Sequence, residues 1–194
     1  DILRGVIYLF SKGEWVGQSD MTPEFLAMST GTFLGINYMV WFAIIVAVIG
    51  FVVMGYTRFG RRIYAVGNSE ANAKISGINT ERTKWCAYII SGVIAGIAGL
   101  LWVCKYGNAQ GTTATGFELN VIAAVVLGGV SITGGSGSVI GVVLGSLLFG
   151  MLSNILPLIQ VSPFWQRAIR GAVILISVVI NALVSRRAER KALE

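Results

Sequence analysis

Long runs of uncharged, apolar residues alternate with short polar segments along most of this chain. Asn37–Tyr56 carries no charge over 20 positions, and Trp85–Cys104 is a second uncharged run of the same length. A helix of about 20 residues is roughly 30 Å long, which matches the hydrocarbon thickness of a bilayer. These two runs therefore predict membrane-spanning helices.

Three further apolar runs follow. Leu119–Thr133 is shorter, whereas Val139–Ile159 is long, glycine-rich and interrupted late by Pro157. Gly171–Val184 is short unless it extends back past two arginines, whose long side chains can reach the membrane interface. The whole pattern predicts an all-α fold, a polytopic transmembrane helical bundle with about five spans in this chain.

The remaining segments differ from the spans in composition. Residues 1–36 mix one short apolar stretch with polar, turn-rich sequence, which predicts a re-entrant or extracytoplasmic segment. The membrane region is expected over 37–184, with a polar loop at 57–84 inside it, and residues 185–194 are expected to form a basic tail.

Composition supports lipid as the solvent for much of the chain. Hydrophobic residues make up 55% of the 194 positions and charged residues only 12%, with a mean hydropathy of +0.75. Soluble domains have about 25% charged residues. The sequence has no histidine and two cysteines, Cys86 and Cys104, 18 positions apart. No histidine-based catalytic site or metal site is expected, and no catalytic residue is assigned.

The basic residues gather on one side of the predicted membrane. If loop 57–84 is cytoplasmic, alternation of the spans also places the C-terminus in the cytoplasm. The inner segments then hold ten Lys and Arg (Arg58, Arg61, Arg62, Lys74, Arg82, Lys84, Arg186, Arg187, Arg190, Lys191). The outer segments and their border hold three (Lys105, Arg167, Arg170). This asymmetry is typical of a multi-pass membrane protein and argues against a nucleic-acid interface.

Glycine spacing predicts close helix packing. Small residues four apart let helices approach each other in lipid. The residues that we expect at such contacts are Gly92, Gly96, Gly128, Gly129, Gly137, Gly141 and Gly145. A role in helix sliding during a transport cycle is the alternative interpretation of the same pattern.

Uncharged polar residues within or beside the spans are candidates for a solute pathway. Such groups are costly in lipid and usually face a cavity or another helix. The candidates are Asn108, Gln110, Asn120, Asn154 and Asn181. Hydrogen bonding between helices is the competing interpretation for each asparagine, and Glu118 is interpreted as capping the helix that follows it.

The polar loop contains a short helix signature at residues 69–76. Asn68 or Ser69 can cap its start, and Glu70 lies in the first turn, where the helix dipole favours an anion. Gly77 can take the left-handed conformation that ends such a helix. A short helix with a small apolar side fits a groove on a soluble partner, and a simple connector is the alternative.

Several motifs in order carry a resemblance to a known family. The loop motif is GRRIYAVGN at 60–68, followed by Gly77-Ile78-Asn79, and the second is GFELNVIAAVVLGG at 116–129. GGSGS at 134–138 follows, and we interpret it as a tight turn between helices. The region 57–185 closely resembles bacterial ABC importer permeases for monosaccharides, the branch that includes ribose, xylose, arabinose, galactose, rhamnose and autoinducer-2.

The resemblance implies a permease of roughly ten helices, of which this chain is expected to be the C-terminal half. It also implies that loop residues contact a separate ATPase. These coupling residues are Gly60, Arg62, Asn68, Glu70, Ala71, Ala73, Gly77 and Ile78.

The expected partners are a cytoplasmic ABC ATPase, a second permease subunit, a periplasmic sugar-binding protein and the lipid of the bacterial inner membrane. The sequence has no phosphate-binding loop of the GxxxxGK(S/T) type, so ATP and Mg²⁺ are expected on the ATPase and no cofactor on this chain. A branched-chain amino-acid permease and a passive channel are the alternatives.

Overall fold

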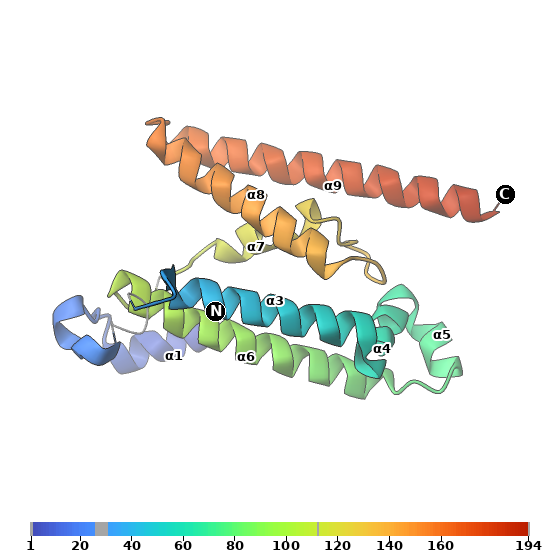
Figure 1. Ribbon diagram of the computed structural model, residues 1–194, viewed down its shortest axis with the longest axis horizontal. Coiled ribbons are helices and arrows are strands. Elements are labelled where there is room, and N and C mark those ends of the chain that lie inside the picture. The colour runs from blue at the N-terminus through green and yellow to red at the C-terminus, as the bar shows by residue number, and fades with distance from the viewer. Residues whose placement is uncertain (1, 26–30, 112, 194) are drawn as a thin grey trace. The chain divides into compact units, whose positions relative to one another are not determined.

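The computed structural model describes residues 2–25, 31–111 and 113–193, with side chains over 5–25, 31–111, 113–162 and 164–179 (Figure 1). The chain forms two compact units. The first contains Asp1–Ile49 and Lys84–Thr115, and the second contains Gly50–Thr83 and Gly116–Glu194.

The elements are almost all helices. Their order is α1 (Ile2–Ser11), the 3-10 helix η1 (Gln18–Asp20), β1 (Thr32–Phe33), β2 (Ile36–Asn37), α3 (Tyr38–Tyr56), α4 (Arg58–Asn68), α5 (Glu70–Ile75), α6 (Thr80–Tyr106), α7 (Phe117–Leu127), α8 (Val139–Leu158) and α9 (Pro163–Leu193). The predicted all-α fold is confirmed, apart from one small hairpin.

That hairpin lies in the first unit, where the sequence predicted only polar surface leading to a span. Thr32 pairs with Asn37 and Phe33 with Ile36 in antiparallel register. Leu34 and Gly35 form the two-residue turn, and both have positive φ, as the turns that match strand twist require. The Trp41 indole Nε1 donates to the Phe33 carbonyl at 3.1 Å, which ties the hairpin to the start of α3.

Three of the predicted spans are helices long and apolar enough to cross a membrane. Among the described residues these are α3, α6 and α8. Helix α6 is longer than its apolar run, because it starts at Thr80 and continues to Tyr106. Helix α9 contains the predicted span 171–184 and continues through the basic tail as far as Leu193.

The run 119–133 forms a shorter helix than the sequence predicted. Helix α7 has 11 residues, about 16 Å at 1.5 Å per residue, roughly half the hydrocarbon thickness. It ends at Gly128, and Gly129 then has a φ of +82°, a conformation that turns the chain out of the helix. The glycine pair near the end of the run is therefore the physical reason for the early stop.

The second unit has its core between α7, α8 and α9. Ala123 and Ala124 of α7 and Phe149 of α8 are buried together, and Ile174 of α9 packs against them. Small residues on α7 let α8 approach closely, so the short helix is held by protein rather than by lipid.

Candidate coupling site

Helix α4 turns sharply away from the end of α3 through a tight corner. The Thr57 hydroxyl donates to the Val53 carbonyl at 2.6 Å and accepts from the Gly60 amide at 3.2 Å. Gly60 is buried, and a Cβ built on it would lie 2.6 Å from the Met54 Cα. Only glycine fits at this position, so Gly60 shapes the corner rather than offering a side chain to a partner.

The far end of α4 packs on the glycine-rich turn between α7 and α8. A Cβ built on Gly67 would lie 2.7 Å from the Gly135 amide nitrogen, and one on Gly134 would lie 2.7 Å from the Gly67 carbonyl oxygen. Gly134 and Gly135 also have positive φ values of +93° and +75°. The turn that the sequence predicted at 134–138 therefore connects α7 to α8 and also provides the surface on which α4 packs.

Tyr64 adds a hydrogen bond to this contact. Its hydroxyl donates to the Gly137 carbonyl at 3.0 Å, across 73 residues of sequence. The polar loop is thereby joined to the turn that leads into α8, and the Ser138 hydroxyl caps α8 by accepting from the Gly141 amide at 3.0 Å.

Removing the Tyr64 hydroxyl should weaken this contact measurably. We expect Tyr64→Phe to lower the free energy of unfolding by about 1 kcal/mol, the usual net value of one hydrogen bond. Denaturant unfolding in mild detergent measures the change. Tyr56→Phe is the matched control, since Tyr56 is 72% exposed at the end of α3. An equal loss in both variants would show that the bond to Gly137 contributes nothing.

Helix α5 has the capping groups that the sequence predicted. The Ser69 hydroxyl accepts from the Asn72 amide at 3.3 Å, so Ser69 rather than Asn68 is its N-cap. Gly77 has a φ of +76°, and the Ile78 amide donates to the Ala73 carbonyl at 3.0 Å. These bonds satisfy the end of a helix that has only six residues.

Glu70 connects α5 to the start of α6. Its Oε1 lies 3.1 Å from the Lys74 Nζ and accepts from the Thr80 hydroxyl at 3.3 Å. Thr80 is only 2% exposed. The Asn79 Oδ1 accepts from the Arg82 amide at 2.9 Å and caps α6. Displacement of α5 would therefore pull directly on the first turn of α6.

The two alanines of α5 have opposite surroundings. Ala73 is buried, with 3% of its surface exposed, so it packs within this chain and is not available to a partner. Ala71 is exposed, and Ile75, four residues later on the same side, is 86% exposed. This pair forms a small apolar surface, which we call the α5 surface. The sequence singled out Ala71 as a coupling residue, and Ile75 is exposed beside it.

The other coupling candidates lie around this surface. Arg62 and Asn68 are exposed on α4, and Ile78 is half-buried after the end of α5. Gly77 is exposed, with no atom of the described residues within 4 Å of a Cβ built on it. Its role is therefore set by backbone conformation alone.

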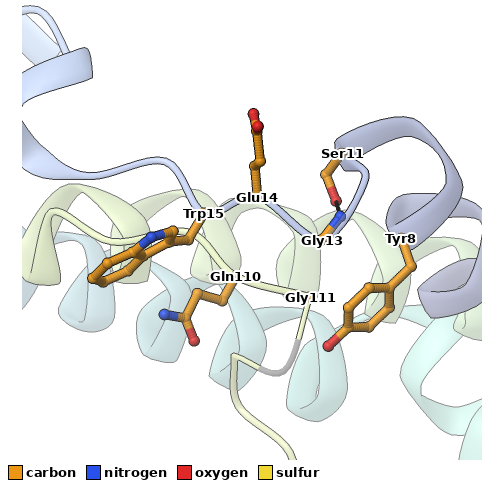
Figure 2. A pocket seen from close by; sticks show the side chains of 7 residues that line it. All are labelled: Tyr8, Ser11, Gly13, Glu14, Trp15, Gln110 and Gly111. Atoms are coloured by element: carbon orange, nitrogen blue, oxygen red, sulfur yellow. Dashed lines mark hydrogen bonds between the residues drawn. The ribbon is translucent and has the colours of Figure 1, made fainter.

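Two solute-pathway candidates lie in the first unit. Gln110 lines an open cavity of about 290 Å³, also lined by Tyr8, Ser11, Gly13, Glu14, Trp15 and Gly111. Figure 2 shows Gln110 between the Trp15 and Tyr8 rings, with the Glu14 carboxylate pointing away from it. Val16 and Ala109 exchange two backbone hydrogen bonds of 3.1 Å, which hold the two walls together. The half-buried Asn108 has an Oδ1 atom with no hydrogen-bond partner in the described part of the chain.

The remaining asparagine candidates are not brought together. Asn120 is half-buried on α7, and Asn154 is exposed on α8. Asn181 lies on α9 outside the described side chains. Glu118 is exposed in the first turn of α7, but the prediction that it caps this helix is wrong, because the N-cap is Gly116 and no side-chain hydrogen bond from the described residues caps that end.

The predicted packing glycines divide into three groups. Gly128, Gly141 and Gly145 lie at the contact of α7 and α8, where a Cβ on Gly145 would lie 2.6 Å from the Gly128 amide nitrogen. Gly129 and Gly137 have positive φ and shape the turn instead. For Gly92 and Gly96, no atom of the described residues comes within 4 Å of a Cβ built on either position.

Comparison with known proteins gives the family. Residues 2–178 match the family described as branched-chain amino acid transport system / permease component. The chain belongs to this family. Together with three helices able to span a bilayer, the membership identifies it as a multi-pass membrane protein.

Individual relatives are named as sugar permeases. The ribose import permease protein RbsC of Escherichia coli (strain K12) is 38% identical over 182 residues, which are 93% of this chain and 57% of that protein. The L-arabinose transport system permease protein AraH of the same strain is 35% identical over 180 residues, 93% of this chain and 54% of that protein. RbsC of Bacillus subtilis (strain 168) is 37% identical over 180 residues, 93% of this chain and 56% of that protein.

This chain thus spans little more than half the length of the curated relatives it matches. No solved structure is significantly similar to it.

Proposed function

We propose that this chain belongs to the transmembrane subunit of an ATP-binding-cassette importer that moves a monosaccharide across the bacterial inner membrane. The observation that carries the proposal is the polar loop. It presents an exposed apolar pair, Ala71 and Ile75, on a short helix that Glu70 ties to Thr80 at the start of α6. The relatives named as ribose and arabinose permeases support the choice of a sugar.

The coupling is mechanical. A cytoplasmic ATPase binds ATP and Mg²⁺, closes, and displaces α5 through the α5 surface. The hydrogen bond between Glu70 and Thr80 transmits the displacement to α6. The Tyr64 hydrogen bond and the packing of Gly67 on Gly134 and Gly135 transmit it to the turn before α8. Rigid helices then reorient around the solute path, as in other transitions driven by differential binding.

The other partners follow from the same assignment. A second permease subunit completes the pore, and a periplasmic binding protein delivers the sugar. The loop 57–84 and the C-terminus lie in the cytoplasm, because ten of the assigned basic residues then fall on the inner side and three on the outer.

The candidate side chains of the solute pathway are better suited to bind a neutral polar solute than an amino acid. Sugars are bound by aromatic rings and by amide groups that donate and accept hydrogen bonds. Trp15, Tyr8 and Gln110 provide these groups around one cavity, and Asn108 provides an acceptor that has no hydrogen-bond partner among the described residues. A zwitterionic amino acid would instead need a paired positive and negative site.

Uptake by the complete natural transporter, reconstituted with its ATPase and binding protein, tests the proposal. We expect labelled ribose or arabinose to accumulate only with ATP, and leucine not to accumulate. Accumulation of leucine in place of sugar would assign the chain to amino-acid import. Sugar flux that is equally fast without ATP would make it a passive channel.

A further inference from the structure

Helix α4 carries three arginines on one side, of which only Arg62 was expected from the sequence to contact the ATPase. Arg58, Arg61 and Arg62 are spaced three and four residues apart, so they share one side of the helix. All three are exposed, and none makes an ion pair within the described part of the chain. We call them the α4 arginines.

The packing of α4 on protein includes the side opposite Arg58. Arg58 and Gly67 are nine residues apart, two and a half helical turns, so they lie on opposite sides of the helix. Gly67 contacts the Gly134-Gly135 backbone, and Tyr64 bonds to Gly137. Within the second unit, therefore, the Gly67 contact lies opposite Arg58, while Arg61 lies on the same side as Tyr64 and is nevertheless exposed.

Their position along the chain places them at the level of lipid headgroups. Arg58 comes two residues after the end of the spanning helix α3, and the Thr57 and Gly60 contacts hold α4 close to that end. Tyr56, the last residue of α3, is 72% exposed. Exposed tyrosine at the end of a span is typical of the membrane–water interface.

We propose that the α4 arginines bind the phosphate groups of anionic phospholipids, which anchors α4 beside the membrane surface. Guanidinium groups bind phosphate oxygens with two parallel hydrogen bonds, and three of them within about one turn match a layer of anionic headgroups. The inference does not depend on the sugar, and at Arg62 it competes with the ATPase contact that the sequence resemblance implies.

Lipid titration of the purified, intact protein tests this directly. Fluorescent phosphatidylglycerol is titrated into the protein in uncharged detergent, with phosphatidylcholine as the reference lipid and inorganic phosphate as the competitor. The variant is Arg58→Gln, Arg61→Gln, Arg62→Gln. The control removes the same charge from three exposed sites elsewhere, Arg82→Gln, Lys105→Gln, Arg167→Gln.

The proposal expects the α4 variant to bind phosphatidylglycerol about tenfold or more weakly, because three guanidinium groups that bind phosphate together from one helix are lost at once. The control should bind as the natural protein does, and phosphatidylcholine binding should change in neither. Equal losses in variant and control would show general charge attraction and overturn the proposal. Displacement by millimolar inorganic phosphate would identify a free-phosphate site and overturn it as well.

A third outcome would show that a protein, and not lipid, binds this side of α4. Unchanged lipid binding, with loss of ATPase capture in the α4 variant alone, would assign this side of α4 to a protein partner and overturn the proposal. Because ATPase capture is scored separately, failure of the lipid inference and failure of the proposed transport function are distinguishable.

Discussion

Gly145→Val is expected to lower the free energy of unfolding by about 3 kcal/mol or more, beyond the usual range for overpacking. Gly145 is buried on α8, where a Cβ would lie 2.6 Å from the Gly128 amide nitrogen and 2.8 Å from its Cα. The obstacle is backbone of α7, which cannot rotate aside as a side chain can. The substitution therefore has to separate the two helices.

The same helix offers a matched control for this prediction. Gly150 lies five residues later on α8, and no atom of the described residues is within 4 Å of a Cβ built there. We expect Gly150→Val to unfold at nearly the parent denaturant concentration in mild detergent. If the two valine variants are equally stable, the close approach of α7 and α8 does not hold the second unit together.

Ala71→Trp is expected to abolish ATP-dependent uptake and to weaken capture of the ATPase about tenfold or more. Ala71 is exposed, so the larger side chain meets no packed neighbour in this chain and leaves the fold and membrane insertion intact. The cost arises in the complex, because a groove that receives alanine beside Ile75 has no room for an indole ring.

Two controls separate this effect from a general effect of bulk. Ala71→Ser keeps the size of the side chain, and we expect it to transport at the parent rate. Ala168→Trp adds the same ring at an exposed position on α9, and we expect it to capture the ATPase normally. Normal capture and uptake by Ala71→Trp would show that α5 is not the coupling element.

The features that the sequence predicted well are local ones. Uncharged runs predicted α3, α6 and α8, because the length and polarity of a span follow from the bilayer. The caps of α5 and α6 were also predictable, since Ser69, Gly77 and Asn79 act on neighbouring backbone groups.

The features that were missed depend on contacts between distant segments. Nothing near Tyr64 in the sequence indicates a bond to Gly137, 73 residues away. Helical spacing places Ala71 and Ala73 on different sides of α5, but it does not say which side packs within the chain. The hairpin at 32–37 was missed because its strands have two residues each, too few for an alternating pattern.

Site-specific crosslinking from α5 tests the central claim most directly. Ile75→Cys is introduced into the complete transporter, with Cys86 and Cys104 replaced by alanine, and treated with a short thiol-to-amine crosslinker. Ala168→Cys is the control for an exposed cysteine elsewhere on the chain. The coupling account predicts a crosslink to the ATPase at position 75 that changes in yield when ATP is added, and none at position 168. An ATPase that co-purifies with the permease but fails to crosslink at position 75 would contradict it.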